Sequence, residues 1–156
     1  MKYLIIILIQ LIGLSLHGQN LVMDWRQCYG GVGYDEGNDL VRTNSGYLIL
    51  SVWNQQQVWL IKTDFDGNFM WGKKYGGSYC DYANKILKKD ENTFYIIGST
   101  SSSDGDITYD PYPDSDDFWI VKIDSLGNKI WDKIFGGTGI DDAYNACLNT
   151  EWLSHS

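Results

Sequence analysis

The sequence is poor in the residues on which many enzyme mechanisms rely. It has two histidines, His17 and His155, and three cysteines. His17 lies at the end of an apolar N-terminal run, so His155 is the only imidazole in the remainder of the chain. Ser-His-Asp and Cys-His catalysis need a histidine base beside the nucleophile. Because no plausible base and no CxxC or Cys/His cluster is present, we expect neither mechanism, and no zinc site.

Basic residues are also scarce. The chain has 12 Lys and Arg against 20 Asp and Glu, a formal net charge of -8. Such a protein repels nucleic acid and anionic membranes, so polyanion binding is not expected. With 44% hydrophobic and 15% aromatic residues among 156, the composition excludes a disordered chain or coiled coil and allows one ordinary domain.

The N-terminus has the pattern of an export signal. Lys2 precedes the apolar run from Leu4 to Leu16, which is shorter than the roughly 20 residues of a membrane-spanning helix. We interpret residues 1–18 as a signal peptide, cleaved after Gly18 to leave Gln19 first. An uncleaved anchor is the alternative. We therefore expect a secreted or cell-surface protein, periplasmic or extracellular, without a stable membrane span in its mature chain.

The cysteines do not define a disulfide scaffold. Cys28, Cys80 and Cys147 are an odd number of thiols in a chain expected to be exported. Either Cys28 and Cys80 form a bridge, or all three are small buried apolar residues.

An internal repeat organises the mature chain. Residues 59–83 and 119–143 match at an offset of 60, and residues 25–31 match the segment that ends at Gly77 at an offset of 46. The matched positions include Asp64 with Asp124, Trp71 with Trp131, Gly76-Gly77 with Gly136-Gly137, and Asp81 with Asp141. Self-similarity at tens of residues is typical of repeat architectures. Recurring acids favour a structural role, since a catalytic group normally occurs once.

Each unit predicts four short strands rich in Val, Ile, Leu, Tyr and Trp. The expected strands are 39–43, 47–53, 58–63 and 68–75 in the first unit, and 84–88, 94–100, 118–123 and 128–135 in the second. The turns Asp64–Gly67 and Asp124–Gly127 fit a type I turn followed by a left-handed glycine.

Apolar residues occupy both alternating faces of the third strand in each unit, so we expect these strands to be covered on both sides. Consecutive hairpin-connected sheets stacked in this way describe a β-propeller, with a β-sandwich as the competing architecture. The predicted fold is all-β: two four-stranded antiparallel blades with partial flanking strands, an incomplete propeller. The expected divisions are a signal peptide (1–18), an N-terminal closing-type strand (19–37), blade 1 (38–77), blade 2 (78–137) and the start of a truncated third blade (138–156).

These motifs resemble a known repeat family. The pattern of Trp, Gly-Gly, Asp-x-Ala and W-[IL]-[IV]-K-x-D-x-x-G-N-x-x-W over about residues 24–146 resembles the propeller-like tandem repeat of secreted and surface proteins of the Bacteroidetes type. Such proteins often carry a sorting domain for type IX secretion, which is not found in this sequence. The resemblance implies a fold and a location, but no reaction.

The segment D-x-x-G-N-x-x-W also resembles the tryptophan-docking repeat of quinoprotein propellers. That resemblance implies that Trp71 and Trp131 dock between blades, beside Gly76-Gly77 and Gly136-Gly137, and share similar buried surroundings.

The feature unique to the second unit is an acidic insertion at residues 101–117. Its carboxylates include Asp104, Asp106 and Asp110, which are candidate calcium ligands, although their spacing is not that of an EF-hand. Two other interpretations stay open. One is a solvated rim loop that folding does not need, and the other is a partner-binding loop that uses Tyr109 and Tyr112.

The sequence therefore predicts an exported, non-catalytic repeat protein with a structural or binding role at the cell surface. The sequence does not identify a partner, and leaves open a protein or glycan at the cell surface as well as self-association through open blade edges. We predict no catalytic residue and no organic cofactor. The alternatives are a quinoprotein-like or carbohydrate-active propeller enzyme and a calcium-dependent adhesin.

Overall fold

The computed structural model describes residues 26–54, 56–113 and 115–149. The predicted signal peptide and Trp25 lie outside these residues. The strands are β1 (Glu36–Thr43), β2 (Gly46–Trp53), β3 (Gln57–Thr63), β4 (Phe69–Tyr75), β5 (Asp81–Asp90), β6 (Thr93–Thr100), β7 (Asp117–Asp124) and β8 (Lys129–Phe135). No helix occurs among the described residues.

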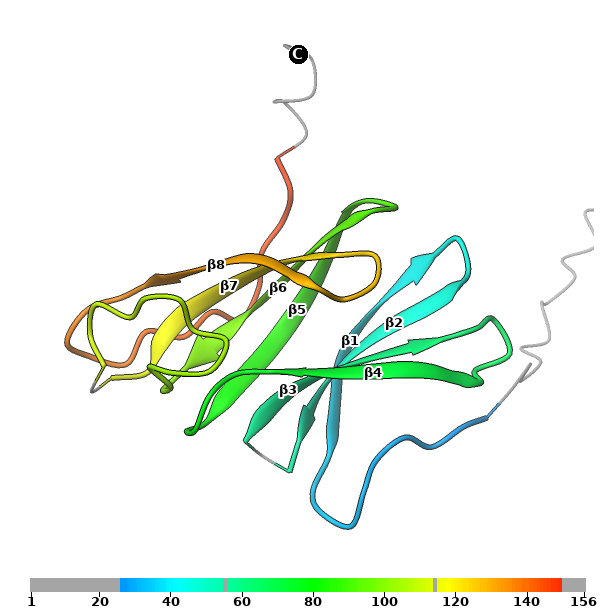
Figure 1. The fold of residues 1–156 in the computed structure, drawn as a ribbon, viewed down its shortest axis with the longest axis horizontal. Coiled ribbons are helices and arrows are strands. Elements are labelled where there is room, and N and C mark those ends of the chain that lie inside the picture. The colour runs from blue at the N-terminus through cyan, green and yellow to red at the C-terminus, as the bar shows by residue number, and fades with distance from the viewer. Residues whose placement is uncertain (1–25, 55, 114, 150–156) are drawn as a thin grey trace, which may run out of the picture.

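The strands form two antiparallel four-stranded sheets, as Figure 1 shows. The first sheet has the order β1-β2-β3-β4 and the second the order β5-β6-β7-β8. This confirms the all-β prediction and the two four-stranded antiparallel sheets. Neither sheet is closed on itself. The largest differences at a strand start are at β1 and β5, which begin at Glu36 and Asp81 instead of Asp39 and Asn84. The first residues of β1 pair with β2, and those of β5 pair with Ser99 and Thr100 of β6.

The two sheets share one pairing register. Leu48 pairs with Lys62 in the first sheet, as Tyr95 pairs with Lys122 in the second. The pairs Leu50–Leu60, Val58–Tyr75, Leu60–Lys73 and Lys62–Trp71 have the counterparts Ile97–Ile120, Phe118–Phe135, Ile120–Lys133 and Lys122–Trp131. Each position in one sheet therefore has a defined structural counterpart in the other.

Successive side chains of a strand point to opposite faces, so each sheet has two faces. We call the face of the first sheet that carries Leu48, Leu50, Val58 and Leu60 its forward face, and the opposite face its backward face. By counterpart position, the forward face of the second sheet carries Tyr95, Ile97, Phe118 and Ile120. Its backward face carries Phe94, Ile96, Trp119, Val121 and Ile123.

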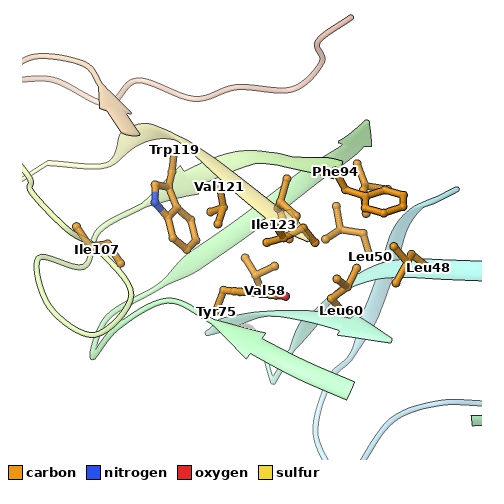
Figure 2. Close-up of a cluster of buried hydrophobic side chains, with 13 residues drawn as sticks. Leu48, Leu50, Val58, Leu60, Tyr75, Phe94, Ile107, Trp119, Val121 and Ile123 are labelled. Carbon is orange, nitrogen blue, oxygen red and sulfur yellow. The ribbon is translucent and has the colours of Figure 1, made fainter. Parts of the chain in front are cut away.

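The hydrophobic core lies between the forward face of the first sheet and the backward face of the second. Leu50, Val58 and Leu60 are fully buried against a cluster that includes Val121 and Ile123. Figure 2 shows this cluster, with Trp119 and Ile107 at one end and Leu48 and Phe94 at the other. Burial of these apolar side chains holds the two sheets together.

The third strands are not covered equally on both faces. In β7, Trp119 and Val121 are buried, whereas Phe118 and Ile120 on the other face are half-buried. Within the described residues, β7 is therefore fully packed on one face only, whereas the sequence predicted packing on both faces. The forward face of the second sheet is the less covered one.

Candidate functional site

The turns after β3 and β7 are built by one aspartate each. Asp64 Oδ1 accepts hydrogen bonds from the backbone N–H groups of Asp66 (2.9 Å) and Asn68 (2.8 Å), and its Oδ2 accepts one from Asn68 Nδ2 (2.8 Å). Hydrogen bonds from the Asn68 side chain and backbone lower the pKa of Asp64.

Asp124 makes the matching set of bonds with Leu126 and Asn128, at 2.7–2.9 Å. These bonds lower its pKa although burial opposes the shift. Both predicted aspartates are thus engaged in shaping a turn that needs a left-handed residue, since Gly67 and Gly127 have φ of 76° and 73°.

A second aspartate recurs after each Gly-Gly pair. The second glycine donates its N–H to the carboxylate four residues later: Gly31 to Asp35 (2.7 Å), Gly77 to Asp81 (2.8 Å) and Gly137 to Asp141 (2.9 Å). The first glycine packs so closely that an added Cβ at Gly76 would collide with the Asp81 carboxylate. These glycines therefore shape a carboxylate-closed turn.

Asp81 is the most enclosed of these acids. It is fully buried, and its carboxylate also accepts hydrogen bonds from the hydroxyls of Thr100 and Ser102 (3.1 Å for the latter). Burial raises the pKa of Asp81, and the hydrogen bonds oppose that shift. The donors to its carboxylate come from its own turn and from the chain at the end of the neighbouring strand β6, which indicates a structural role.

The two repeated tryptophans have different environments. A Cβ added at Gly127 would lie 2.8 Å from Trp71 Cη2, so Trp71 of the first sheet packs on the β7–β8 turn of the second. The sequence expectation placed it beside Gly76-Gly77 instead. Trp131 is half-buried on the forward face of the second sheet, with its ring 6.0 Å from that of Tyr95. The sequence analysis expected Trp71 and Trp131 to be largely buried in similar surroundings. In the structure both side chains are half-buried, and their neighbours differ.

The three candidate calcium ligands do not converge. Asp104 accepts hydrogen bonds from the backbone N–H and hydroxyl of Ser78 (2.7 and 2.5 Å), and Asp106 accepts one from the backbone of Gly76 (3.2 Å). Asp110 bonds the backbone of Tyr112 instead (2.8 Å). Within the described residues, no group of three or more His, Cys, Asp or Glu side chains is arranged to hold a metal ion.

The first half of the insertion is part of the fold, which differs from the picture of a freely solvated rim loop. Ile107 is 7% exposed and belongs to the core cluster beside Trp119. Thr108 donates its backbone N–H to Asp132 (3.0 Å), and Lys129 forms an ion pair with the same carboxylate (2.9 Å). No pattern in the sequence indicated that Ile107, a single isoleucine among polar residues, is part of the core.

The second half of the insertion borders two surface hollows. One, of about 440 Å³, is lined by Tyr79, Ser101, Ser103, Pro113, Ser115 and Asp116. The other, of about 350 Å³, is lined by Pro111, Tyr112, Pro113, Ser115 and Thr138. Neither lining includes a lysine or an arginine. The hollows combine aromatic surface, hydroxyl groups and one carboxylate, which suits hydroxyl-bearing or cationic groups better than anions.

Tyr79 and Asp116 give this surface its character. Tyr79 is 66% exposed, and its backbone N–H is held by the hydroxyl of Ser102 (2.9 Å). Asp116 accepts a hydrogen bond from the Ser101 hydroxyl, while its backbone carbonyl accepts one from Asp141 (2.7 Å). The sequence pointed to the insertion and its tyrosines, but not to Tyr79, which comes from the preceding Gly-Gly segment.

Two buried charged groups were not foreseen. Lys62 is 5% exposed, and its Nζ donates to Thr43 Oγ1 (2.9 Å), Ser45 O (3.1 Å) and Thr63 O (2.9 Å), while burial lowers its pKa. Asp117 is fully buried with Oδ1 lacking a hydrogen-bond partner, and burial raises its pKa. Both residues lie within strands, where alternation predicted only the apolar neighbours.

The cysteines are all free thiols. Cys28 and Cys147 are exposed and Cys80 is half-buried, so neither the Cys28–Cys80 bridge nor three buried thiols is present. In the part of the chain that the structure describes, no helix has the length and hydropathy of a membrane span.

No protein-family model matches the chain, and no curated protein matches its sequence.

Proposed function

We propose that the chain is an exported, non-catalytic repeat protein of the β-propeller-like kind, which binds a protein or glycan at the cell surface through the hollows beside its acidic insertion. The observation that carries the architectural part is the recurrence of contacts between consecutive units. Tyr29 donates its hydroxyl to Gly67 O, and Tyr75, its counterpart, donates to Gly127 O (2.7 Å). Such recurrence is what a stacked repeat requires.

The proposed binding role is supported by a comparison of the acids that recur in each repeat with the residues found only beside the insertion. The recurring acids, such as Asp64 and Asp81, already accept hydrogen bonds from the backbone of their own turns. Tyr79, Pro113 and Asp116 instead border an open hollow at the insertion, which has no counterpart in the first sheet. Loops carried on a rigid scaffold are common binding elements.

The binding part is tested with residues 19–156 against an array of soluble glycans and a set of lysine- and arginine-containing peptides. Tyr79→Ala removes a mostly exposed ring and should weaken the binding that the screen detects by at least about tenfold, the effect of losing roughly 1.4 kcal/mol. Tyr34→Ala is the matched control, because Tyr34 is 60% exposed outside these hollows. Equal binding by both variants would refute this surface as the binding site.

The export part is tested by processing. The intact mass of the protein recovered outside the cytoplasm should correspond to a chain that begins at Gln19. A mature product that retains Lys2 would contradict signal-peptide removal.

A further inference from the structure

The forward face of the second sheet carries large side chains that are only partly covered. Phe135 is 50% exposed, and Phe118, Ile120 and Trp131 are half-buried. Their rings gather in pairs: Phe118 lies 5.7 Å from Phe135, and Tyr95 lies 6.0 Å from Trp131, between ring centroids. Lys122 and Lys133 lie on the same face, paired with Trp131 and Ile120. Partly covered apolar surface of this kind, edged by charged side chains, marks an interaction surface.

The matched register shows what this face corresponds to. Phe118, Ile120 and Phe135 are the counterparts of Val58, Leu60 and Tyr75 in the first sheet. Those three residues are 0%, 0% and 3% exposed, because the backward face of the second sheet covers them. The same surface position is thus buried in one sheet and only partly covered in the other.

We propose that the forward face of the second sheet docks a further antiparallel β-sheet of the same repeat kind, which presents a backward face like that of Phe94, Trp119 and Val121. The inference rests on the repeat architecture of the proposed function and not on its binding role. The existing packing between the two sheets supplies the geometry of the docked state.

The segment from Asp141 onward, which would supply the first strand of that further sheet, is not a strand in this structure but already makes the corresponding contacts. Asn84 Nδ2 donates to Ala143 O (2.8 Å), as Asn38 Nδ2 donates to Ala83 O (2.6 Å) one unit earlier. Ala143 is 9% exposed, so the segment after Asp141 begins to cover the second sheet as the start of β5 covers the first.

A backbone bond recurs at the same junction. Asp141 N–H donates to Asp116 O (2.7 Å), as Asp81 N–H donates to Gln56 O (2.9 Å). The chain after residue 140 therefore enters the docking surface along the path that β5 follows on the first sheet.

The first sheet of a second copy does not fit as the occupant. Phe135 and Tyr29 both occupy the repeat position of Tyr75. If the first sheet of a second copy docked with the geometry seen between the two sheets, Phe135 of the first copy would therefore lie where Tyr29 of the second copy already lies. Tyr29 bonds Gly67 O, and an added Cβ at Gly31 would lie 2.8 Å from Trp53 Cη2. Residues 29–31 thus occupy the position that a docking second copy would need.

The test is a graft. A copy of residues 86–137 is joined after Asn145, where the alignment of residues 141–145 with 81–85 places the next strand. The grafted segment should fold onto the second sheet and slow amide exchange in β6 and β7 by at least about tenfold, the signature of a strand that has joined a cooperative unit. A graft that stays protease-sensitive, with unchanged exchange in β7, would overturn the proposal.

Two controls keep the outcome interpretable. The graft with Phe135→Lys in the parent sheet alters a half-exposed residue and should lose the protection without unfolding the first two sheets, which circular dichroism of the ungrafted variant verifies. The ungrafted chain is measured by light scattering. Concentration-dependent oligomers that Phe135→Lys abolishes would instead identify a second copy as the occupant and overturn the proposal. Neither readout depends on the Tyr79 surface, so failure of the proposed binding role is detected separately.

Discussion

The hydroxyl of Tyr75 donates a hydrogen bond of 2.7 Å to the backbone carbonyl of Gly127, across the boundary between the two sheets. The last strand of the first sheet is thereby tied to the β7–β8 turn of the second. The phenol is buried, and burial together with the nearby carboxylates of Asp106 and Asp124 raises the pKa of Tyr75. The bond therefore involves a neutral phenol at any physiological pH.

Tyr75→Phe should destabilise the protein by about 1–3 kcal/mol, because it leaves a buried carbonyl at Gly127 without its donor while keeping the ring. Urea unfolding measures the change. Tyr109→Phe is the matched control, since Tyr109 is 74% exposed and should change stability by less than about 0.5 kcal/mol. Equal effects of the two substitutions would contradict the role of the inter-sheet bond.

The two repeated tryptophans should differ in their contribution to stability. Trp71→Ala removes a ring packed on Gly127 and against the core, and should cost about 3 kcal/mol, the low end for large buried aromatics. Trp131→Ala removes a ring from the less covered forward face and should cost at least about 1 kcal/mol less. Denaturant unfolding of both variants gives the comparison, and equal losses would show that the two positions are equivalent after all.

The insertion should contribute to stability chiefly through the buried side chain of Ile107. Ile107→Ala should cost about 2–5 kcal/mol as a buried aliphatic truncation. Tyr109→Ala, two residues away and largely exposed, is the control and should be nearly neutral. Deleting residues 104–116 should destabilise the fold for the same reason, whereas a deletion variant with native stability would restore the picture of a dispensable rim loop.

Asp81 should give the stability a measurable pH dependence. Its pKa in the folded protein is raised above the ordinary 3.8, chiefly by burial, so the folded state binds this proton more tightly than the unfolded state. The corresponding stabilisation is fully present below pH 3.8 and is lost as the pH rises through the raised pKa. The stability of the wild type relative to Asp81→Asn should therefore decrease as the pH increases from 3.5 to about 7.

The difference between the two proteins isolates this group. Carboxylates with lowered pKa, such as Asp64 and Asp124, give the opposite slope in both proteins and cancel. Urea unfolding at several pH values provides the data. A wild-type-minus-variant difference that stays constant over this range would show that Asp81 titrates normally.

Much of the fold could be predicted from the sequence because strand alternation and turn chemistry are local. The core of each strand follows from runs such as Val58–Thr63, and the turns follow from Asp64 and Asp124 with their left-handed glycines. Pairing register then follows from the short connections. This local information identified eight strands and two sheets.

The contacts between sheets could not be predicted in the same way, because they join residues far apart in the sequence. The partner of Trp71 is Gly127, and the core role of Ile107 depends on Trp119 of the neighbouring strand. The hollow that includes Tyr79 needs both a Gly-Gly segment and the insertion to be placed together. No local pattern encodes such positions.

The consecutive strand order within each sheet has a consequence for synthesis on the ribosome. Every hydrogen-bonded neighbour is the next strand in the sequence, so β1 to β4 can form a complete sheet before β5 has been made. Until β6 and β7 follow, Leu48, Leu50 and Leu60 remain uncovered on the nascent chain. Chaperones that hold emerging polypeptides should therefore engage the protein most strongly during the interval in which residues 76–123 are being added.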